Sequence, residues 1–169
     1  MTLPCDMSDG TPAVRLNKSQ TEMTELLMPD GANNLGRALG AVVLHWMDVC
    51  GAIAAMRFAS RNCVTAAIDH VDFHAPIQLG EVADVHAYVF ETGATSLDVK
   101  VRVLAENPRT GESRCASDAF FTFVAIDDEG RPTQVPEVVC ETDAERQHRQ
   151  DAIEGRQEQL EALRERLEE

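Results

Sequence analysis

The chain contains very little lysine, few aromatic residues and no excess of positive charge. Only Lys18 and Lys100 among its 15 basic residues are lysines, against 29 acidic residues and a formal net charge of -14. A nucleic-acid-binding protein needs a basic face, so nucleic acid is not expected as a partner. An acidic excess with almost no lysine favours adaptation to a high-salt interior, where salt screens the self-repulsion. The alternative is an ordinary acidic protein whose acid-rich tail inflates the count.

The sequence also lacks paired cysteines, clusters of metal-ligating residues and a segment typical of a membrane anchor. The five cysteines are widely spaced, with no Cys-x-x-Cys pair, which favours reduced thiols and argues against a disulfide scaffold or a thiolate zinc site. His70 and His74 would lie about 13 Å apart along one strand, too far to share a metal ion. There is no signal-peptide pattern and no uninterrupted apolar run of about 18 residues. The sequence therefore predicts a soluble cytoplasmic protein with no metal site and no membrane contact.

A long helix is predicted from Gly40 to Ala59. It is apolar almost all round, as a core helix is, and apart from one cysteine its only ionisable side chains are His45, Asp48 and Arg57. Small residues three and four positions from Asp48 leave a groove along the helix, where a desolvated acid could act as a base. The competing interpretation is a buried acid that is satisfied by a backbone N–H. These residues alone do not decide between the two.

The stretches around this helix have strand character. In Thr95 to Glu106 apolar and charged residues alternate, which is typical of a half-buried antiparallel strand, whereas Ser113 to Ile126 is apolar on both faces and is predicted to be central. Further strands are predicted within Thr21–Met28, Asn62–Phe73 and Glu81–Glu91. The fold class is therefore α+β, with an antiparallel sheet of about five to six strands wrapped around the long helix.

The two ends of the chain differ in composition from this domain. The first 20 residues contain scattered proline, glycine and polar residues without a period. From Glu141 onward Glu, Arg and Gln dominate, with Ile153, Leu160 and Leu167 spaced by seven. This segment is interpreted either as an oligomerising helix or as a solvated one. The predicted organisation is a flexible N-terminal arm at 1–20, one domain at 21–137 and a charged helical extension at 138–169.

Eight short segments together carry a resemblance to a known family. They are Met28–Gly36, Leu39–Ala41, Trp46–Asp48, Val64–Ala66, Val71–Ile77, Gly80–Glu81, Gly93–Ser96 and Phe121–Asp127. In this order they resemble the hotdog-fold acyl-CoA thioesterases, specifically the cytosolic acyl-CoA hydrolases, over residues 23–136. One departure is that the family usually has Phe-Gly-Gly where this chain has Leu39-Gly40-Ala41. The extra methyl group of Ala41 could narrow the pocket.

The resemblance implies a homodimer, or a hexamer built as a trimer of dimers, with active sites formed by both chains. Asp48 and Asn33 would then come from opposite subunits, with Asn33 orienting the water or the substrate. The backbone N–H groups of Gly40 and Ala41 at the helix start could hold the thioester oxyanion, aided by the helix dipole. Asp48 could activate water or attack as a nucleophile. Thr65 could help to place the carbonyl or the water.

The substrate that the resemblance implies is an acyl-CoA in lipid metabolism, and CoA is part of that substrate rather than a separate cofactor. Thr95 and Ser96 are candidate contacts to the coenzyme, and Arg57 and Arg61 are candidate cations for its phosphates. Turn, strand and solvated surface roles remain open for these four residues. The predicted function is hydrolysis of acyl-CoA to free acid and CoA by water activated by Asp48. The alternatives are a non-catalytic acyl-CoA-binding sensor subunit and a hotdog enoyl-CoA hydratase.

Overall fold

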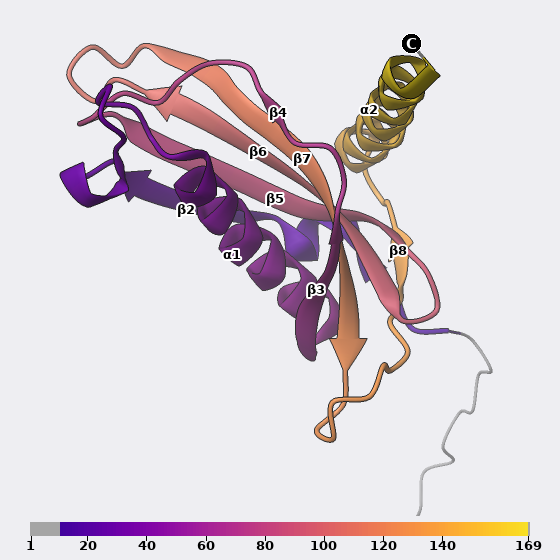
Figure 1. Ribbon diagram of the computed structural model, residues 1–169. Helices are drawn as coiled ribbons and strands as arrows, with labels where there is room; N and C mark the ends of the chain where they lie inside the picture. Colours follow the sequence, from indigo (N-terminus) through magenta and orange to yellow (C-terminus); the bar gives the residue numbers. More distant parts are fainter. Residues whose placement is uncertain (1–10, 169) are drawn as a thin grey trace, which may run out of the picture.

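The computed structural model describes residues 11–168, which are dominated by one curled antiparallel sheet (Figure 1). The sheet has six strands: five follow the order β2-β5-β6-β7-β3, and β4 pairs with β7. The strands are β2 (Thr21–Leu26), β3 (Asn62–Ile68), β4 (Asp72–Phe73), β5 (Val82–Thr92), β6 (Ser96–Glu106) and β7 (Ser113–Ile126). The α+β class and the sheet of five to six strands are confirmed. β7 lies inside the sheet, as its apolar faces predict.

Helix α1 (Gly40–Ala59) packs along one face of this sheet. Its buried residues are Val43, Trp46, Met47, Cys50, Gly51, Ala54, Ala55 and Phe58. Gly51 allows a close approach, because a Cβ atom there would lie only 3.1 Å from the ring of Phe123. By length and composition α1 could cross a membrane, but its burial against the sheet is that of a core helix.

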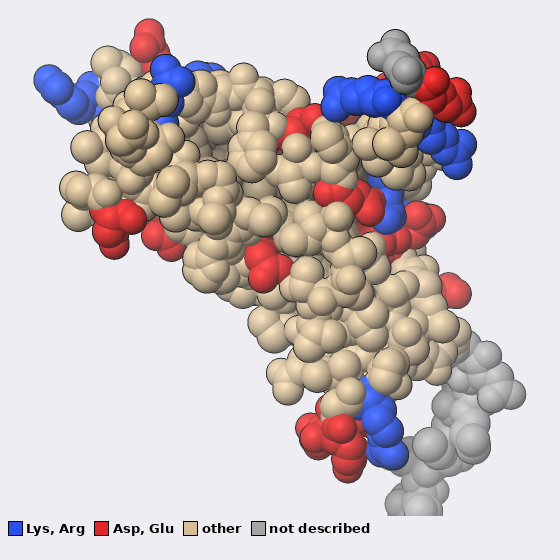
Figure 2. All heavy atoms as spheres, viewed as in Figure 1, with Lys and Arg blue, Asp and Glu red and all other residues tan. Residues whose placement is uncertain are grey.

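The opposite side of α1 is not covered in the protomer, which corrects the expectation of a helix buried all round. Ala41 and His45 are exposed, and Asp48 and Ala52 are partly exposed. The neighbouring edge strand, β3, is also open, with Val64 46% and Ile68 39% exposed. Figure 2 shows that few charged side chains lie on the face formed by α1, β3 and β4, while charges gather at its rim. On a chain of net charge -14, so wide a face with few charged side chains is unusual.

The expected loose N-terminal arm is wrong for residues 11–20. Strand β1 (Ala13–Arg15) pairs in parallel with β8 (Glu137–Val139), and the short 3-10 helix η1 (Leu16–Ser19) follows it. Leu16 and Ser19 are fully buried, and Ser19 Oγ accepts a hydrogen bond from the backbone N–H of Val89 at 2.9 Å. Because β1 and β8 come from opposite ends of the sequence, no local sequence pattern predicts that they pair. Residues 1–10 of the predicted arm lie outside the described residues.

The charged C-terminal extension forms helix α2 (Asp143–Glu168), which packs on the outer face of the sheet (Figure 1). Its buried residues are Glu145, Ala152 and Gln159, spaced by seven but one position before the expected seam. In that seam Leu160 and Leu167 are exposed. Apolar contacts come from Ala152 with Phe90 and Phe120, whose rings meet edge to face. The helix therefore docks mainly through small and polar residues, which a hydrophobic pattern does not reveal.

Glu145 fastens the start of α2 to the N-terminal segment. Its carboxylate accepts hydrogen bonds from the backbone N–H groups of Glu141, Thr142 and Asn17 and from the Arg15 guanidinium. Burial on its own would raise the pKa of Glu145, but these donors outweigh it and lower the pKa from 4.5 to about 2. The carboxylate is therefore charged at neutral pH and ties two distant segments together.

Candidate functional site

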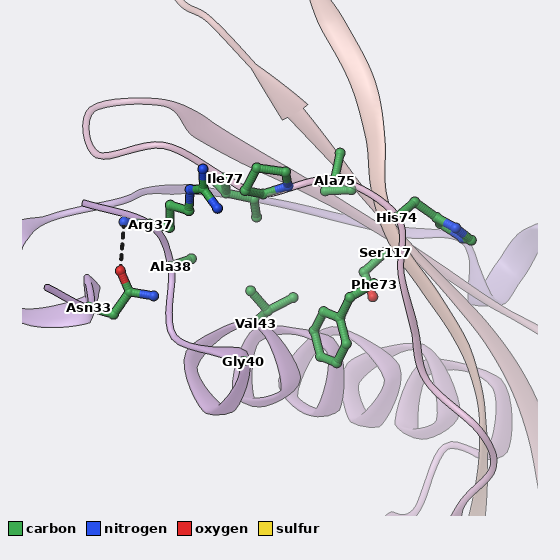
Figure 3. Close-up of a pocket in the computed structure, with 12 residues that line it drawn as sticks. Asn33, Arg37, Ala38, Gly40, Val43, Phe73, His74, Ala75, Ile77 and Ser117 are labelled. Atoms are coloured by element: carbon green, nitrogen blue, oxygen red, sulfur yellow. Dashed lines mark hydrogen bonds between the residues drawn. The ribbon is translucent and has the colours of Figure 1, made fainter. Parts of the chain in front are cut away.

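A cavity of about 340 Å³ opens at the start of α1 (Figure 3). One wall is the loop that leads into the helix, the floor is the first helical turn, and the other wall is the segment after β3. The lining residues are Asn33, Arg37, Ala38, Gly40, Val43, Phe73, His74, Ala75, Pro76, Ile77, Ala116 and Ser117. Two predicted site residues, Asn33 and Gly40, are thus brought into one cavity.

Asn33 shapes the loop that enters the cavity. Its side-chain Oδ1 accepts hydrogen bonds from the backbone N–H groups of Leu35 at 2.9 Å and Arg37 at 3.1 Å. Gly36, with φ of 69°, supplies the left-handed conformation that this turn requires. The amide NH₂ group has no partner within residues 11–168, and Figure 3 shows it directed toward the cavity. One side chain can therefore hold the turn with its oxygen and still offer an N–H donor.

The first turn of α1 supplies further donors beside Asn33. The N–H groups of Gly40 and Ala41 have no intrahelical partner, as at any helix start, and the helix dipole gives this end partial positive charge. The ring of Phe73 lies over Gly40, where an added Cβ atom would be 3.6 Å from Phe73 Cζ. Ala41 is exposed and does not line the cavity, so the departure from the family's second glycine does not narrow it.

Asp48 and Thr65 form a second group on the open side of α1. Thr65 Oγ1, on β3, donates a hydrogen bond to Asp48 Oδ1 at 2.6 Å. Such a charge-assisted bond orients the carboxylate. The other oxygen, Oδ2, has no hydrogen-bond partner in the described part of the chain. Asp48 lies eight residues beyond Gly40, about 12 Å along the helix at its usual rise. In one protomer the acid is therefore separate from the Asn33 cavity.

The residues predicted to contact the coenzyme lie outside the cavity. Arg57 is hydrogen-bonded to oxygen atoms at the start of β2, and Arg61 is exposed in the turn between α1 and β3. Thr95 accepts a backbone hydrogen bond before β6, where Ser96 begins the strand. The structure does not bring these four residues together with Asn33 and Gly40.

Arg37 and Phe73 line the cavity, although no sequence pattern predicted them as site residues. Arg37 is exposed at the cavity wall and has no carboxylate within 4.0 Å among residues 11–168. Its place three residues before the predicted helix start was the available signal. Arg114, in contrast, is held by both carboxylate oxygens of Glu81, at 3.0 and 2.7 Å, and its hydrogen bond lowers the pKa of Glu81. It is therefore not free to bind a phosphate.

His74, Cys115 and Asp118 meet behind the cavity wall, with their potential metal-ligating atoms within 4.8 Å of one another. The sequence did not predict this cluster. His74 Nε2 contacts Asp118 Oδ2 directly, which joins the segment at β4 to β7. Burial raises the pKa of the Cys115 thiol, although the nearby charges of Arg102 and Lys100 oppose this. Because His74 and Asp118 contact each other across the two segments, the cluster is interpreted as a link between strands.

Known proteins match this chain along most of its length. The model of the Thioesterase superfamily matches residues 35–112. An acyl-CoA thioester hydrolase of Bacillus subtilis, itself uncharacterised, is 38% identical over 136 residues, which cover 80% of this chain and 79% of that protein. A crystal structure of an apo-hexameric acyl-CoA thioesterase is 34% identical, with a TM-score of 0.80 over 90% of this chain and 97% of that one.

The acyl-CoA hydrolase of Staphylococcus aureus, solved with butyryl coenzyme A, coenzyme A and coenzyme A disulfide, is similar at 29% identity and a TM-score of 0.75. The superposition covers 94% of this chain and 100% of that one. Its solved variants replace an aspartate, an asparagine or a threonine by alanine. With the helix-wrapping sheet and the cavity at the helix start, these matches confirm the predicted hotdog fold. The chain belongs to the thioesterase superfamily, among its acyl-CoA thioester hydrolases.

Proposed function

We propose that the protein hydrolyses acyl-CoA thioesters at sites that two copies of the chain build together. The observation that carries this proposal is the separation of the two groups within one protomer. The donors at Asn33 and Gly40 lie in the cavity, whereas the Asp48–Thr65 pair lies about 12 Å away on the open side of the helix. Neither group is a complete hydrolytic site alone.

The open face of the protomer favours a symmetric dimer. The exposed side of α1 and the unpaired edge of β3 lie on the face that has few charged side chains in Figure 2, with Val64 and Ile68 exposed. An edge strand of this kind is a template for pairing with another strand. In a two-fold interface each contact occurs twice, so two equivalent sites would form. The hexameric state of a solved relative supports assembly, and a trimer of such dimers would keep the same pair as its unit.

The chemistry follows from placing Asp48 of one subunit against the cavity of the other. The thioester oxygen would accept hydrogen bonds from the Asn33 amide and from the backbone N–H group of Gly40, which stabilise its developing negative charge. Asp48 would remove a proton from a water molecule that attacks the carbonyl carbon. Collapse of the tetrahedral intermediate breaks the C–S bond, and the proton returns to the sulfur of CoA. Thr65 holds one carboxylate oxygen, so that the other can face the water.

The spacing of the replaced residues in the Staphylococcus aureus enzyme supports this assignment. Its asparagine precedes its aspartate by 15 positions, and its threonine follows that aspartate by 17. Asn33, Asp48 and Thr65 are separated by the same intervals and have the same residue types.

The coenzyme would bind at the mouth of this shared site. Arg37 is our added candidate for its phosphates, because this cation lies at the cavity wall. Thr95, Ser96, Arg57 and Arg61 remain candidates that lie outside the cavity of one protomer. The crystal complex of the Staphylococcus aureus enzyme with coenzyme A supports CoA as the carrier part of the substrate.

Thiol release from acyl-CoAs of graded chain length tests the proposal. The wild-type protein should release CoA, and Asp48→Asn, which keeps the shape but removes the base, should lower kcat by about 100-fold or more. Full turnover by Asp48→Asn would contradict the role of the acid. Tight binding of acyl-CoA without thiol release would favour the sensor, and consumption of an enoyl-CoA without thiol release would favour the hydratase.

A further inference from the structure

The wall of the cavity opposite Asn33 is a short and mostly irregular segment. It runs from Asp69 to Pro76 and includes β4, which has only two residues. Its backbone is tied to β7 by the N–H groups of Asp69, His74 and Ala75, which donate to carbonyl oxygens of that strand, and by Ser117 Oγ, which donates to the carbonyl of Asp72. The His74 side chain also contacts Asp118 on β7. A two-residue strand contributes little pairing, so its position depends on further contacts.

Helix α2 supplies such contacts from the outer face of the sheet. Arg156 Nε lies 2.9 Å from Asp69 Oδ2, at the start of the segment, and its Nη1 lies 3.0 Å from Asp98 Oδ2 on β6. All three side chains are mostly buried. Asp98 is itself held by Thr122 Oγ1 at 2.8 Å. One guanidinium thus connects the start of this segment to a central strand of the sheet.

Gln159 makes the second contact, one turn further along α2. Only 9% of this residue is exposed, and its Nε2 donates to Asp72 Oδ2 at 3.0 Å. Its Oε1 is buried without a hydrogen-bond partner in the described chain. A buried unpaired amide oxygen is unfavourable, so apolar packing does not account for a glutamine here. Its polar contact in the structure is the bond to Asp72.

Asp72 transmits this contact to the cavity because the next residue is Phe73. Successive side chains of a strand point to opposite faces, so Asp72 meets α2 while Phe73 points to the start of α1. Figure 3 shows the Phe73 ring directed toward Gly40. Phe73 is 58% exposed and therefore has little packing of its own to fix it. A shift of Asp72 would move this ring across the helix start.

We propose that α2 is a clamp on the wall of the substrate cavity, and that Gln159 and Arg156 are positioning residues for acyl-CoA binding. Gln159 holds Asp72, Arg156 holds Asp69, and together they keep the Phe73 ring at a fixed distance from the helix start. The inference rests on the proposed function, in which the thioester lies beside Gly40. Loosening the clamp should therefore weaken substrate binding more than it slows the chemical step.

Gln159→Glu tests the clamp with almost no change of shape, because it places a carboxylate against the carboxylate of Asp72. We expect KM for acyl-CoA to rise roughly fivefold or more, with kcat within about twofold of the wild type. The matched control is Gln157→Glu, the same substitution on the exposed side of the same helix, which should leave both constants unchanged. Gln159→Ala, a milder variant, should raise KM in the same direction. An unchanged KM in both Gln159 variants would overturn the inference.

Exchanging the hydrogen-bond donor and acceptor between positions 72 and 159 should restore substrate binding. In the double variant Asp72→Asn with Gln159→Glu, the amide of the new residue on β4 can donate to the new carboxylate on α2. KM should return toward the wild-type value. A double variant with a KM as high as that of Gln159→Glu would contradict a direct contact between the two positions.

Amide hydrogen exchange measures the clamp without enzymatic activity. Peptides that cover residues 69–76 should exchange faster in Gln159→Glu and at the wild-type rate in Gln157→Glu. Equal exchange in all three proteins would overturn the clamp, and faster exchange with an unchanged KM would overturn its role in binding. If the wild type released no thiol, the proposed function would fail instead, and faster exchange would still support α2 as the element that holds this segment.

Discussion

The two helices pack on opposite faces of the same sheet by different chemistry. α1 uses apolar and small residues, and the side that it turns away from the sheet is also mostly apolar and partly uncovered. α2 uses an ion pair, a buried glutamate and a buried glutamine, and its outer side is charged. An uncovered apolar helix needs a second surface, whereas a solvated charged helix does not. This difference supports the proposal that α1 faces a second chain, whereas α2 packs on its own chain.

Introducing a charge on the exposed face formed by α1 and β3 should have the largest effect, on both assembly and activity. Ile68 lies on the exposed edge of β3, so Ile68→Asp would bury an unpaired carboxylate in a dimer interface while leaving the protomer's core intact. We expect the mass in solution to fall to that of the single chain and thiol release to be lost. Light scattering with a parallel activity assay measures both. A monomeric variant with full activity would contradict a site built from two chains.

Removing the hydrogen bond from Thr65 to Asp48 should have an intermediate effect on kcat. Thr65→Val keeps the volume but loses the 2.6 Å bond to Asp48. We expect kcat to fall by about tenfold, because the carboxylate loses its orientation but remains present. Steady-state kinetics with one acyl-CoA measures this change. Thr65→Ser, which keeps the hydroxyl group, is the control and should retain most of kcat; equal losses in both variants would argue against the bond.

Neutralising the carboxylate that fastens α2 should change stability and its pH dependence, with the smallest effect on kcat. The folded pKa of Glu145 is about 2, below its ordinary value of 4.5. A depressed pKa contributes stability above pH 4.5 that is lost as the pH falls toward about 2. Glu145→Gln should therefore be less stable than the wild type at pH 7, with a difference that narrows below pH 4.5. Urea unfolding across this range measures it; a difference that does not change with pH would contradict the role of the charge.

Much of the fold could be predicted because its signals are local. Alternation in β6, two-sided apolarity in β7 and the apolar run of α1 depend only on neighbouring residues. The pairing of β1 with β8 could not be predicted, because it joins the two ends of the chain. In α2 the expected leucine seam was one position from the buried side, since Glu145 and Gln159 dock through hydrogen bonds rather than apolar area.

Only part of the candidate site could be predicted from the sequence, because some of its residues come together through contacts between distant segments. Asp48 stood out as an acid on an apolar helix, and Asn33 and Thr65 came from the family resemblance. Arg37 and Phe73 line the same cavity because the loop before α1 and the segment at β4 lie on its two sides in the folded chain. No local sequence pattern shows this arrangement. The cytoplasmic location and the adaptation to high salt remain predictions from composition.

Subunit complementation tests the central claim most directly. Asn33→Asp keeps the oxygen that holds the loop but removes the N–H donor, and Asp48→Asn removes the base. Each variant alone should be nearly inactive. In a mixed dimer one site combines the intact Asp48 of the first chain with the intact Asn33 of the second, so mixing the unfolded variants and refolding them together should restore thiol release. If the mixture stays as inactive as either variant alone, the two residues do not meet across the interface.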